Sequence, residues 1–285
     1  MTTSFQDIII KLQQYWIDKG CAYVTSSDIE VGAGTLHSYT VLRCLSEKEW
    51  NVCYIQPSRR PTDGRFGQNP NRLGSYNQYQ VIMKPSPPDL QNLFLCSLEA
   101  IGLDIENNEI RFVEDDWENP TVGAWGLGWE IWLNGMEIAQ YTYMQQIGGI
   151  NTDPIPGELT YGLERIAMYI QDVSNVYDLK YNDKLSYRDI YYKNEVQMSK
   201  YYQELSNPDM LIQQFNELEK ECERMIDYDL SIPAYELCLK TSHTLNMLDA
   251  RGIISVNERT SYISRVRNLA KKACLVWVKN NSSDQ

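Results

Sequence analysis

Apolar residues recur every three to four positions at the start of the chain, which predicts an amphipathic helix over residues 5–19. Ser4 precedes this pattern and can cap its first turn, and Gly20 follows it and can end it. The same periodicity predicts further helices over residues 89–101, 163–170, 208–227, 233–250 and 255–279. Ser255 and Glu258 have the spacing of a capping box at the start of the last helix.

Alternating or short apolar runs predict five β-strands. They span residues 52–58, 76–84, 111–113, 129–133 and 136–143. Asn134 and Gly135 separate the last two strands, and this dipeptide is a strong signal for a two-residue hairpin turn. Long hairpins with helices between them predict an α+β fold, in which helices cover an antiparallel sheet, rather than a doubly wound parallel sheet.

The segment that joins the first two strands is long and polar. Glycines and prolines shape it, and it contains four arginines: Arg59, Arg60, Arg65 and Arg72. A hairpin loop of this length is uncommon unless it binds something, and arginine binds phosphate through two parallel hydrogen bonds. In a chain with a net charge of −12, this cluster predicts a local anion site. The alternative is a solvated basic hairpin.

Alternation along these two strands separates an apolar face from a polar face. The apolar residues, which suit a core, are Cys53, Ile55, Pro57, Tyr79, Val81 and Met83. The polar face combines Arg60 and the ring of Tyr76 with the amides of Gln56, Gln78 and Gln80. This combination suits a polyphosphate, a base and a small polar ligand. The alternation therefore predicts that Arg60, rather than Arg59, points into the site.

The chain of 285 residues is long enough for one large domain or for a catalytic domain with a smaller one. Its composition changes from residue 173, where a segment rich in tyrosine, asparagine and aspartate precedes three helical patterns. We therefore expect a catalytic domain over residues 1–172 and a mainly helical domain over residues 173–285. The net charge of −12 argues against a broad nucleic-acid surface on this chain alone.

The numbers and spacing of cysteines and histidines indicate the cellular compartment of the protein and bear on metal binding. Seven cysteines are scattered without a CxxC pair, and there are only two histidines. This usage predicts reduced, mostly buried thiols in a cytoplasmic protein and disfavours a zinc site. The N-terminus lacks the pattern of a signal peptide, and no stretch is long and apolar enough to span a membrane, so no membrane association is expected.

Three weaker signals leave alternatives open. The glycines of residues 28–35 predict a tight turn or, alternatively, close approach of the backbone to a ligand. The acidic run at residues 114–116 is either solvated or, opposite the arginine loop, able to hold a metal ion or orient the arginines. Arg165 lies in the first turns of its helix, where pairing with Glu158 is its simplest structural role.

Several of these segments together resemble the class II aminoacyl-tRNA synthetases. The spacing of Arg60, Arg72, Tyr76 and Gln78 resembles motif 2 of that family, and GLER at residues 162–165 resembles motif 3. The longer stretches EVGAGT, QPSRRPTDGR, NPNR, VEDDWENP, GAWGLGWE, WLNGME and ELTYGLER resemble the α subunit of the bacterial heterotetrameric (α2β2) glycyl-tRNA synthetase. The resemblance extends from the first predicted helix to the last.

The resemblance implies a six-stranded antiparallel sheet flanked by helices, a homodimer of this chain, and ATP, Mg²⁺ and glycine as ligands. It implies that Arg60 holds the α-phosphate and the carboxylate of glycine, and that Arg72 holds the γ-phosphate. Adenine would lie between the ring of Tyr76 and the guanidinium of Arg165, which also reaches the γ-phosphate. Arg60 and Arg165 are the expected catalytic residues, because the reaction needs positioning and charge neutralisation rather than a general base.

The resemblance also suggests a glycine pocket. Glu158 and Thr160 match positions that hold the amino group of glycine in other glycyl enzymes. Weaker candidates for the same pocket are Gln78, Gln80, Thr35 and Trp117. Glu137 is the candidate magnesium ligand. The implied activity is that of a glycine–tRNA ligase, which forms glycyl-adenylate and pyrophosphate and then transfers glycine to the 3′ end of tRNA(Gly).

The acidic charge and the resemblance together imply a division of labour, in which a separate β subunit supplies most of the tRNA binding. The last predicted helix carries one basic cluster, which is either a solvated face or a contact to the β subunit or tRNA: Arg259, Arg265, Arg267, Lys271 and Lys272. Motif 1 of this superfamily has a proline at the dimer interface, but no proline precedes Pro57 here. The dimer contact at motif 1 is therefore expected to differ, and the first helix can maintain it.

Gln197-Met-Ser-Lys200 resembles the KMSKS loop of class I synthetases, but the chain lacks the HIGH motif that those enzymes also need, so we reject a class I assignment. One alternative is a class II-like enzyme that adenylates another small molecule, such as a relative of asparagine or biotin ligases. The other is a non-catalytic nucleotide-binding regulator, which the presence of all three motif arginines disfavours.

Overall fold

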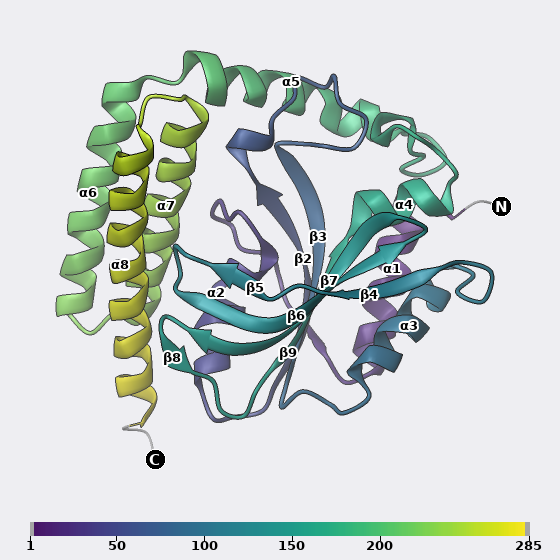
Figure 1. Ribbon diagram of the computed structural model, residues 1–285, viewed down its shortest axis with the longest axis horizontal. Coiled ribbons are helices and arrows are strands. Elements are labelled where there is room, and N and C mark those ends of the chain that lie inside the picture. The colour runs from purple at the N-terminus through teal and green to yellow at the C-terminus, as the bar shows by residue number, and fades with distance from the viewer. Residues whose placement is uncertain (1–2, 283–285) are drawn as a thin grey trace.

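The computed structural model describes residues 3–282 and centres on one β-sheet (Figure 1). The strands follow the spatial order β1-β2-β3-β9-β7-β6-β4, while β5 pairs with β6 and β8 pairs with β7. Within the described residues, all of these pairs are antiparallel except β1 with β2. The strands are β1 (Ala22–Tyr23), β2 (Trp50–Arg59), β3 (Ser75–Lys84), β4 (Ile110–Glu114), β5 (Trp117–Asn119), β6 (Ala124–Leu133), β7 (Met136–Ile147), β8 (Ile150–Asn151) and β9 (Gly157–Gly162).

Helices flank the sheet on both faces. In Figure 1, α1, α3 and α4 lie on one side of the sheet, and α6, α7 and α8 stand together on the other. The α-helices are α1 (Phe5–Asp18), α2 (Ser38–Val41), α3 (Leu90–Ala100), α4 (Leu163–Ile170), α5 (Lys193–Lys200), α6 (Pro208–Asp227), α7 (Ser231–Ala250) and α8 (Val256–Ser282). The predicted α+β class is confirmed, and the bounds of the predicted helices lie close to those observed.

The sheet has nine strands within residues 3–282, so the expected count of six is wrong. Six longer strands form the antiparallel run β2-β3-β9-β7-β6-β4, and β1, β5 and β8 add two or three residues each. Strand β9 is not among the strands that the sequence predicted. It lies between β3 and β7, where its backbone is paired on both sides. A polar strand is stable there because its neighbours satisfy its hydrogen bonds.

One core lies between the sheet and the helices α1, α3 and α4. Helix α1 contributes Phe5, Ile8, Leu12 and Trp16, all fully buried, at the spacing that the sequence predicted. Ser4 caps this helix with its side chain and forms a capping box with Asp7. The apolar faces of β3 and β9 complete this core through Tyr79, Val81, Leu159 and Tyr161. The predicted apolar face is confirmed for Cys53, Ile55, Tyr79, Val81 and Met83, whereas Pro57 near the end of β2 is exposed.

A second core lies on the opposite face of the sheet, at the ends of β2, β6 and β7 that lie next to α6–α8. It joins Tyr54, Met144 and Ile147 of the sheet to Tyr235 and other residues of the C-terminal helices. The hydroxyl of Tyr235 donates to the carbonyl of Leu36 at 2.8 Å. The C-terminal helices thus cover one part of this face and leave the polar residues on the rest of it uncovered.

The segment after α4 returns to the N-terminus before it leads to α5. The amides of Phe5 and Gln6 donate to the carbonyls of Lys180 and Tyr181, each at 3.0 Å. The rings of Tyr181 and Tyr187 contact the ring of Phe5, and Tyr187 is fully buried in the first core. This tyrosine-rich segment therefore closes the fold around α1. The proposed domain boundary at residues 172/173 stays a prediction.

All seven cysteines have free thiols, and six of them are buried: Cys21, Cys44, Cys53, Cys222, Cys238 and Cys274. Among the described helices, none combines the length and apolarity that crossing a membrane requires. The hairpin turn predicted at Asn134-Gly135 is confirmed, since Leu133 pairs with Met136 and both turn residues have positive φ angles, as a tight primed turn requires.

Candidate active site

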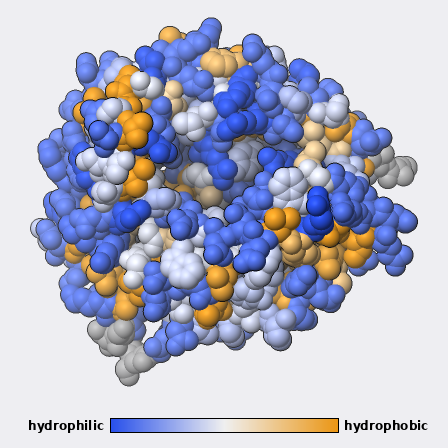
Figure 2. All heavy atoms as spheres, in the orientation of Figure 1, coloured by the Kyte–Doolittle hydropathy of each residue, from blue (hydrophilic) through white to orange (hydrophobic). Residues whose placement is uncertain are grey.

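A cavity of about 370 Å³ opens on the uncovered polar face of the sheet. The strands β3, β7 and β9 form its floor, the loop between β2 and β3 forms one wall, and the start of α4 forms another. Figure 2 shows that this view of the molecule is hollowed near its centre and that hydrophilic residues ring most of the hollow. The predicted motif 2 and motif 3 segments are both among the cavity walls, although about a hundred residues separate them in sequence.

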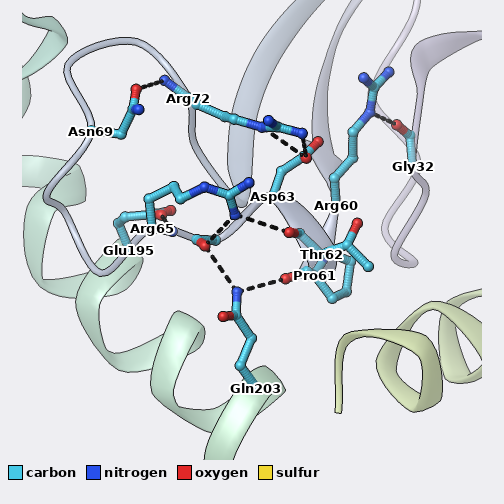
Figure 3. Close-up of polar contacts among 11 residues, drawn as sticks. Gly32, Arg60, Pro61, Thr62, Asp63, Arg65, Asn69, Arg72, Glu195 and Gln203 are labelled. Carbon is cyan, nitrogen blue, oxygen red and sulfur yellow. Dashed lines mark hydrogen bonds and ion pairs between the residues drawn. The ribbon is translucent and has the colours of Figure 1, made fainter. Parts of the chain in front are cut away.

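Three arginines converge on this cavity, and each contacts a partner within the chain. Nε of Arg60 donates to the carbonyl of Gly32 at 3.0 Å (Figure 3). Nη2 of Arg72 lies 2.6 Å from Oδ1 of Asp63, which also accepts from Nε at 3.0 Å. Arg165 is the third, and Arg59 contacts Tyr202 outside the cavity. Strand alternation therefore identified the inward arginine correctly.

The ring of Tyr76 lies against this cluster. The guanidinium carbon of Arg60 lies 5.2 Å from the centroid of the Tyr76 ring, within cation–π range. Burial raises the pKa of Tyr76 to about 12, although the charge of Arg60 opposes this shift. The ring is therefore neutral at physiological pH and presents a flat aromatic surface to the cavity.

Arg165 pairs with Glu137 and not with Glu158, so the simplest role suggested by the sequence is wrong. Its Nη1 donates to the Glu137 carboxylate at 3.0 Å and to the Glu137 carbonyl at 2.9 Å. Helix α4 begins at Leu163 directly after β9, which places Arg165 in its first turn above the strand β7 that carries Glu137. Glu158 does not line the cavity and is only 2% exposed.

Polar side chains at the cavity floor form two hydrogen-bonded groups. Thr160 donates to Oε1 of Gln80 at 2.9 Å, and the amide of Gln80 donates to the Glu158 carboxylate. Gln78 accepts from the amide of Gly34 at 2.9 Å and from Ser58 at 2.8 Å. Thr160 and Gln78 line the cavity, whereas Gln80, Glu158 and Thr35 are buried beside it: they are 0%, 2% and 3% exposed.

The buried carboxyl of Glu158 has an altered affinity for protons. Burial raises its pKa to about 7, and hydrogen bonds from Thr35 and Gln80 oppose this shift. Gly34 explains the close approach of the neighbouring loop, because a Cβ there would lie 2.4 Å from Oε1 of Gln80. The glycines of this segment thus serve contact between the loop and β3, and the residues from Gly34 form a 3₁₀ turn.

Two predicted groups lie away from the cavity. Trp117 lies on β5 and packs partly buried against the second core. The acidic run at residues 114–116 is fully on the exposed surface. Within the described residues, neither contributes to the cavity lining and no group of three or more metal-binding side chains gathers anywhere. The sequence therefore located the residues of motifs 2 and 3 at the cavity but not these two groups, which lie outside both motifs.

Glu137 can still serve a nucleotide-bound Mg²⁺. Such ions usually take one or two protein carboxylates together with phosphate oxygens and waters, so a cage of three side chains is not required. The Glu137 carboxylate is 30% exposed at the cavity wall, and its oxygen chemistry suits this metal. Its contact with Arg165 places an anionic and a cationic group side by side. The carboxylate could bind a metal ion, and the guanidinium could bind the phosphate that the metal accompanies.

Sequence reasoning missed Glu164, which lines the cavity and is 5% exposed. Its Oε1 accepts from the Asn77 amide at 2.8 Å and from the Tyr187 hydroxyl at 2.8 Å. Its Oε2 has no hydrogen-bond partner within the described residues. Burial raises the pKa of this carboxyl, and the hydrogen bonds from Asn77 oppose the shift. Its position beside Arg165 in the motif 3 segment was the available signal.

Comparison with solved structures gives two similar chains, both pyrrolysyl-tRNA synthetases from Desulfitobacterium hafniense. The first, titled PylSc, is 16% identical, with 63% of this chain and 71% of that chain covered and a TM-score of 0.46. The second is 14% identical, with 65% of this chain and 75% of that chain covered and a TM-score of 0.44.

Comparison with protein-family models gives a match to the glycyl-tRNA synthetase alpha subunit over residues 5–282. The match spans nearly the whole chain of 285 residues and includes both cavity walls. Enzymes of this family are ligases of the class II aminoacyl-tRNA synthetase type, and ATP is a substrate of such enzymes. The arginine-lined cavity next to an antiparallel sheet and the family match lead to the same conclusion: this chain belongs to the glycyl-tRNA synthetase alpha subunit family.

Proposed function

We propose that this chain activates glycine with ATP to form glycyl-adenylate and pyrophosphate, and then transfers glycine to the 3′ end of tRNA(Gly) together with a β subunit. The observation that carries the proposal is the convergence of Arg60, Arg72 and Arg165 on one cavity beside the ring of Tyr76. Three cations and an aromatic surface fit a triphosphate attached to a base.

The chemistry of the first step requires little from the protein beyond positioning. The glycine carboxylate attacks the α-phosphorus of ATP, and pyrophosphate leaves. In our proposal Arg60 binds the α-phosphate and the glycine carboxylate, so that two anions meet in line. Arg72 and Arg165 bind the γ-phosphate, and Tyr76 and Arg165 enclose adenine. Fixed cations that stabilise the charge that develops at the phosphates account for the catalysis.

We propose Mg²⁺ at the Glu137 side of the cavity, next to Arg165. When bound, the metal would neutralise phosphate charge. The residues of the chain do the rest: Arg165 orients the phosphates from α4, and Glu137 holds Arg165 in place through its carboxylate and its carbonyl.

The proposed glycine pocket consists of the polar floor beside the arginines. Thr160 and Gln78 line the cavity, so we propose them as the direct contacts. Gln80 orients Thr160 by accepting a hydrogen bond from its hydroxyl, and Glu158, which also contacts Thr35, accepts from the amide of Gln80. The amide of Gly34 and the hydroxyl of Ser58 orient Gln78. Trp117 is not part of this proposed pocket, because it packs against the second core.

The proposed assembly follows from the family. We propose that two copies of this chain form a dimer and that two β subunits complete the tetramer. The exposed surface supports a need for a partner, because a chain with a net charge of −12 provides no long-range attraction for tRNA.

Amino-acid-dependent ATP–pyrophosphate exchange by the purified chain, alone and with the β subunit, tests the proposed substrate. We expect exchange with glycine and almost none with alanine or serine, because a pocket that fits glycine excludes larger side chains by steric clash. Equal exchange with alanine would refute the glycine assignment. Exchange with none of these amino acids, even with the β subunit, would favour a class II-like ligase for another small molecule.

A further inference from the structure

Helix α5, outside the predicted motifs, lies against the outer side of the arginine loop. The loop comprises residues 60–74, and α5 is followed by a π-helical turn, η6 (Tyr201–Leu205). In Figure 3, Glu195 and Gln203 of this segment reach up to the loop from below. Gln197–Lys200, which looked like a class I motif in the sequence, belongs to α5 and thus lies on the back of the class II site.

Glu195 connects the two legs of the loop. Its Oε1 accepts from the amide of Arg65 at 2.9 Å, and its Oε2 accepts from the amide of Gly74 at 2.9 Å. The residue is only 7% exposed, and a carboxylate that accepts two amide hydrogen bonds makes stronger contacts than a neutral acceptor does. One buried side chain therefore fixes the distance between the outgoing and the returning leg.

The contact continues directly to a catalytic arginine. The carbonyl of Gly74 accepts from the amide of Arg60 at 2.7 Å. Gly74 therefore binds Glu195 through its amide and Arg60 through its carbonyl. Asp63, the partner of Arg72, lies two residues before Arg65. Gly74 thus links Glu195 to the backbone of Arg60 through two hydrogen bonds. Arg65, which Glu195 binds directly, lies two residues after Asp63, the partner of Arg72.

Two neighbours of Glu195 bind the tip of the loop. The hydroxyl of Ser199 accepts from the amide of Phe66 at 3.1 Å, and the amide of Gln203 donates to the carbonyl of Gly64 at 2.9 Å. The loop glycine permits this contact, because a Cβ on Gly64 would lie 2.7 Å from Oγ of Ser199. Side-chain contacts from α5 and η6 therefore replace the backbone pairing that a shorter hairpin would have.

Polar contacts support the outgoing leg of the loop, whereas Leu73 on the returning leg is buried in the first core. A second cavity, of about 360 Å³, separates the base of the hairpin from the tyrosines of the segment behind it. Arg251 of α7 fixes the far end of the support by donating to the carbonyls of Gln203 and Ser206 at 2.9 and 3.1 Å. The polar contacts of this anchored helix thus act together with the buried Leu73 and with the hydrogen bond from the amide of Val176 to the carbonyl of Pro70 in positioning the loop.

We propose that Glu195 is a positioning residue that holds the ATP-binding loop and thereby aligns Arg60 and Arg72 for nucleotide binding. The proposal rests on the proposed function of the cavity as an ATP and glycine site. Loss of the Glu195 carboxylate frees the amides of Arg65 and Gly74, and the loop then samples positions in which the arginines no longer meet the triphosphate.

The first test measures the loop itself and does not depend on catalysis. Trypsin cleaves after arginine. The peptide bond between Arg65 and Phe66 contains the amide that donates a hydrogen bond to the hydroxyl of Ser199. In Glu195→Gln we expect faster cleavage after Arg65 and Arg72 than in the unchanged chain, and Ser199→Ala should show a smaller increase at Arg65. Glu204→Gln is the matched control, because it removes the same charge from an exposed position of the same segment. Unchanged protection in folded Glu195→Gln would overturn the proposal.

The second test measures the consequence for ATP. In glycine-dependent exchange we expect Glu195→Gln to lower kcat/KM for ATP by about 100-fold, the cost of misplacing catalytic groups by about 1 Å. The value of kcat/KM for ATP in Glu204→Gln should not change. A loosened loop with unchanged ATP kinetics would overturn the positioning role.

ATP binding by each chain, measured by calorimetry without glycine, separates this proposal from the proposed function. If no amino acid supports exchange but Glu195→Gln still loosens the loop and weakens ATP binding relative to Glu204→Gln, the positioning role stands and the glycine assignment fails. If Glu195→Gln unfolds the chain, Ser199→Ala decides instead, and equal cleavage and equal ATP affinity in Ser199→Ala and the unchanged chain would overturn the proposal.

Discussion

Each of the three cavity arginines already has a contact within the chain. Arg72 pairs with Asp63 at the surface, where ion pairs contribute little, whereas Arg165 is held by both the carboxylate and the carbonyl of Glu137. Arg60 lies over Tyr76, the ring on which adenine is proposed to stack. Where ATP displaces such a contact, its affinity reflects the difference between the old and new contacts.

Replacing the cavity arginines should remove activity without unfolding the chain. We expect Arg60→Ala and Arg165→Ala each to raise the activation free energy of glycine-dependent exchange by about 3–4 kcal/mol, since each would remove one donor from the charge that develops at the phosphates. Arg59→Ala is the matched control, because Arg59 contacts Tyr202 outside the cavity. Near-normal exchange by either cavity variant, with an unchanged circular dichroism spectrum, would contradict its assigned role.

Glu158 should make stability depend on pH. Its pKa is raised by burial from 4.5 to about 7, so the folded state holds a proton that the unfolded state loses. The stability associated with Glu158 is therefore complete below about pH 4.5 and is lost as the pH rises through 7. The loss approaches about 3 kcal/mol. Glu158→Gln cannot lose this proton, so its free energy of unfolding should fall less between pH 5 and pH 8 than that of the unchanged chain.

Urea unfolding of both chains at several pH values measures this difference. Only the dependence on pH matters, because the amide also alters the hydrogen bond with Gln80 at every pH. Parallel dependence of the two chains on pH would show that Glu158 is ionised in the folded state throughout this range.

At the scale of elements, the sequence predicted most helices and the two long hairpins because their periodicity is strong and local. Strand β9 was missed because its place between β3 and β7 results from pairing with strands distant in sequence. The motif arginines and Tyr76 could be placed because alternation orients them, and the resemblance assigned their roles. The role of Glu195 could not be predicted from the sequence, because it depends on contacts between α5 and a loop that lies about 120 residues earlier in the chain.

The capping box of α1 gives a stability prediction for one element. Ser4→Ala removes the side-chain acceptor for the Asp7 amide at the start of a helix whose apolar face is buried in the first core. We expect the free energy of unfolding to fall by about 1 kcal/mol. Urea unfolding at neutral pH measures it, and Lys11→Ala, at an exposed position of the same helix, is the control. Equal stability of Ser4→Ala and the unchanged chain would mean that the tertiary contacts of α1 make its cap dispensable.

At the scale of the whole molecule, the basic cluster of α8 does not form a free cationic surface. Arg259, Arg265 and Lys272 pair with carboxylates of α6 and α7: Asp249, Glu219 and Glu223. Arg267 donates to the carbonyl of Pro120. Most of the cluster thus helps to hold the C-terminal helices together. Because the chain carries a net charge of −12, this favours the interpretation as a structural or solvated face over a tRNA contact.

The charge leads to a prediction for the assembly. We expect this chain alone to dimerise and to bind ATP but to charge tRNA(Gly) poorly, because no long-range attraction brings tRNA to it. Addition of the β subunit should raise the charging rate by about 10- to 1000-fold, the range over which electrostatic steering changes association rates. Gel filtration and charging assays with and without the β subunit measure both. Efficient charging by the purified chain alone would refute the division of labour.

The contact between α1 and the segment after α4 also bears on how the chain folds during synthesis. Asn182 contacts Gln6 at a sequence separation of 176, and the amides of Phe5 and Gln6 donate to the carbonyls of Lys180 and Tyr181. At a ribosomal rate of about 5–20 residues per second, the N-terminal helix is made roughly ten to thirty seconds before these acceptors exist. Its apolar face is a candidate for binding by a chaperone during that interval, and the first core can close only when about two thirds of the polypeptide has been translated.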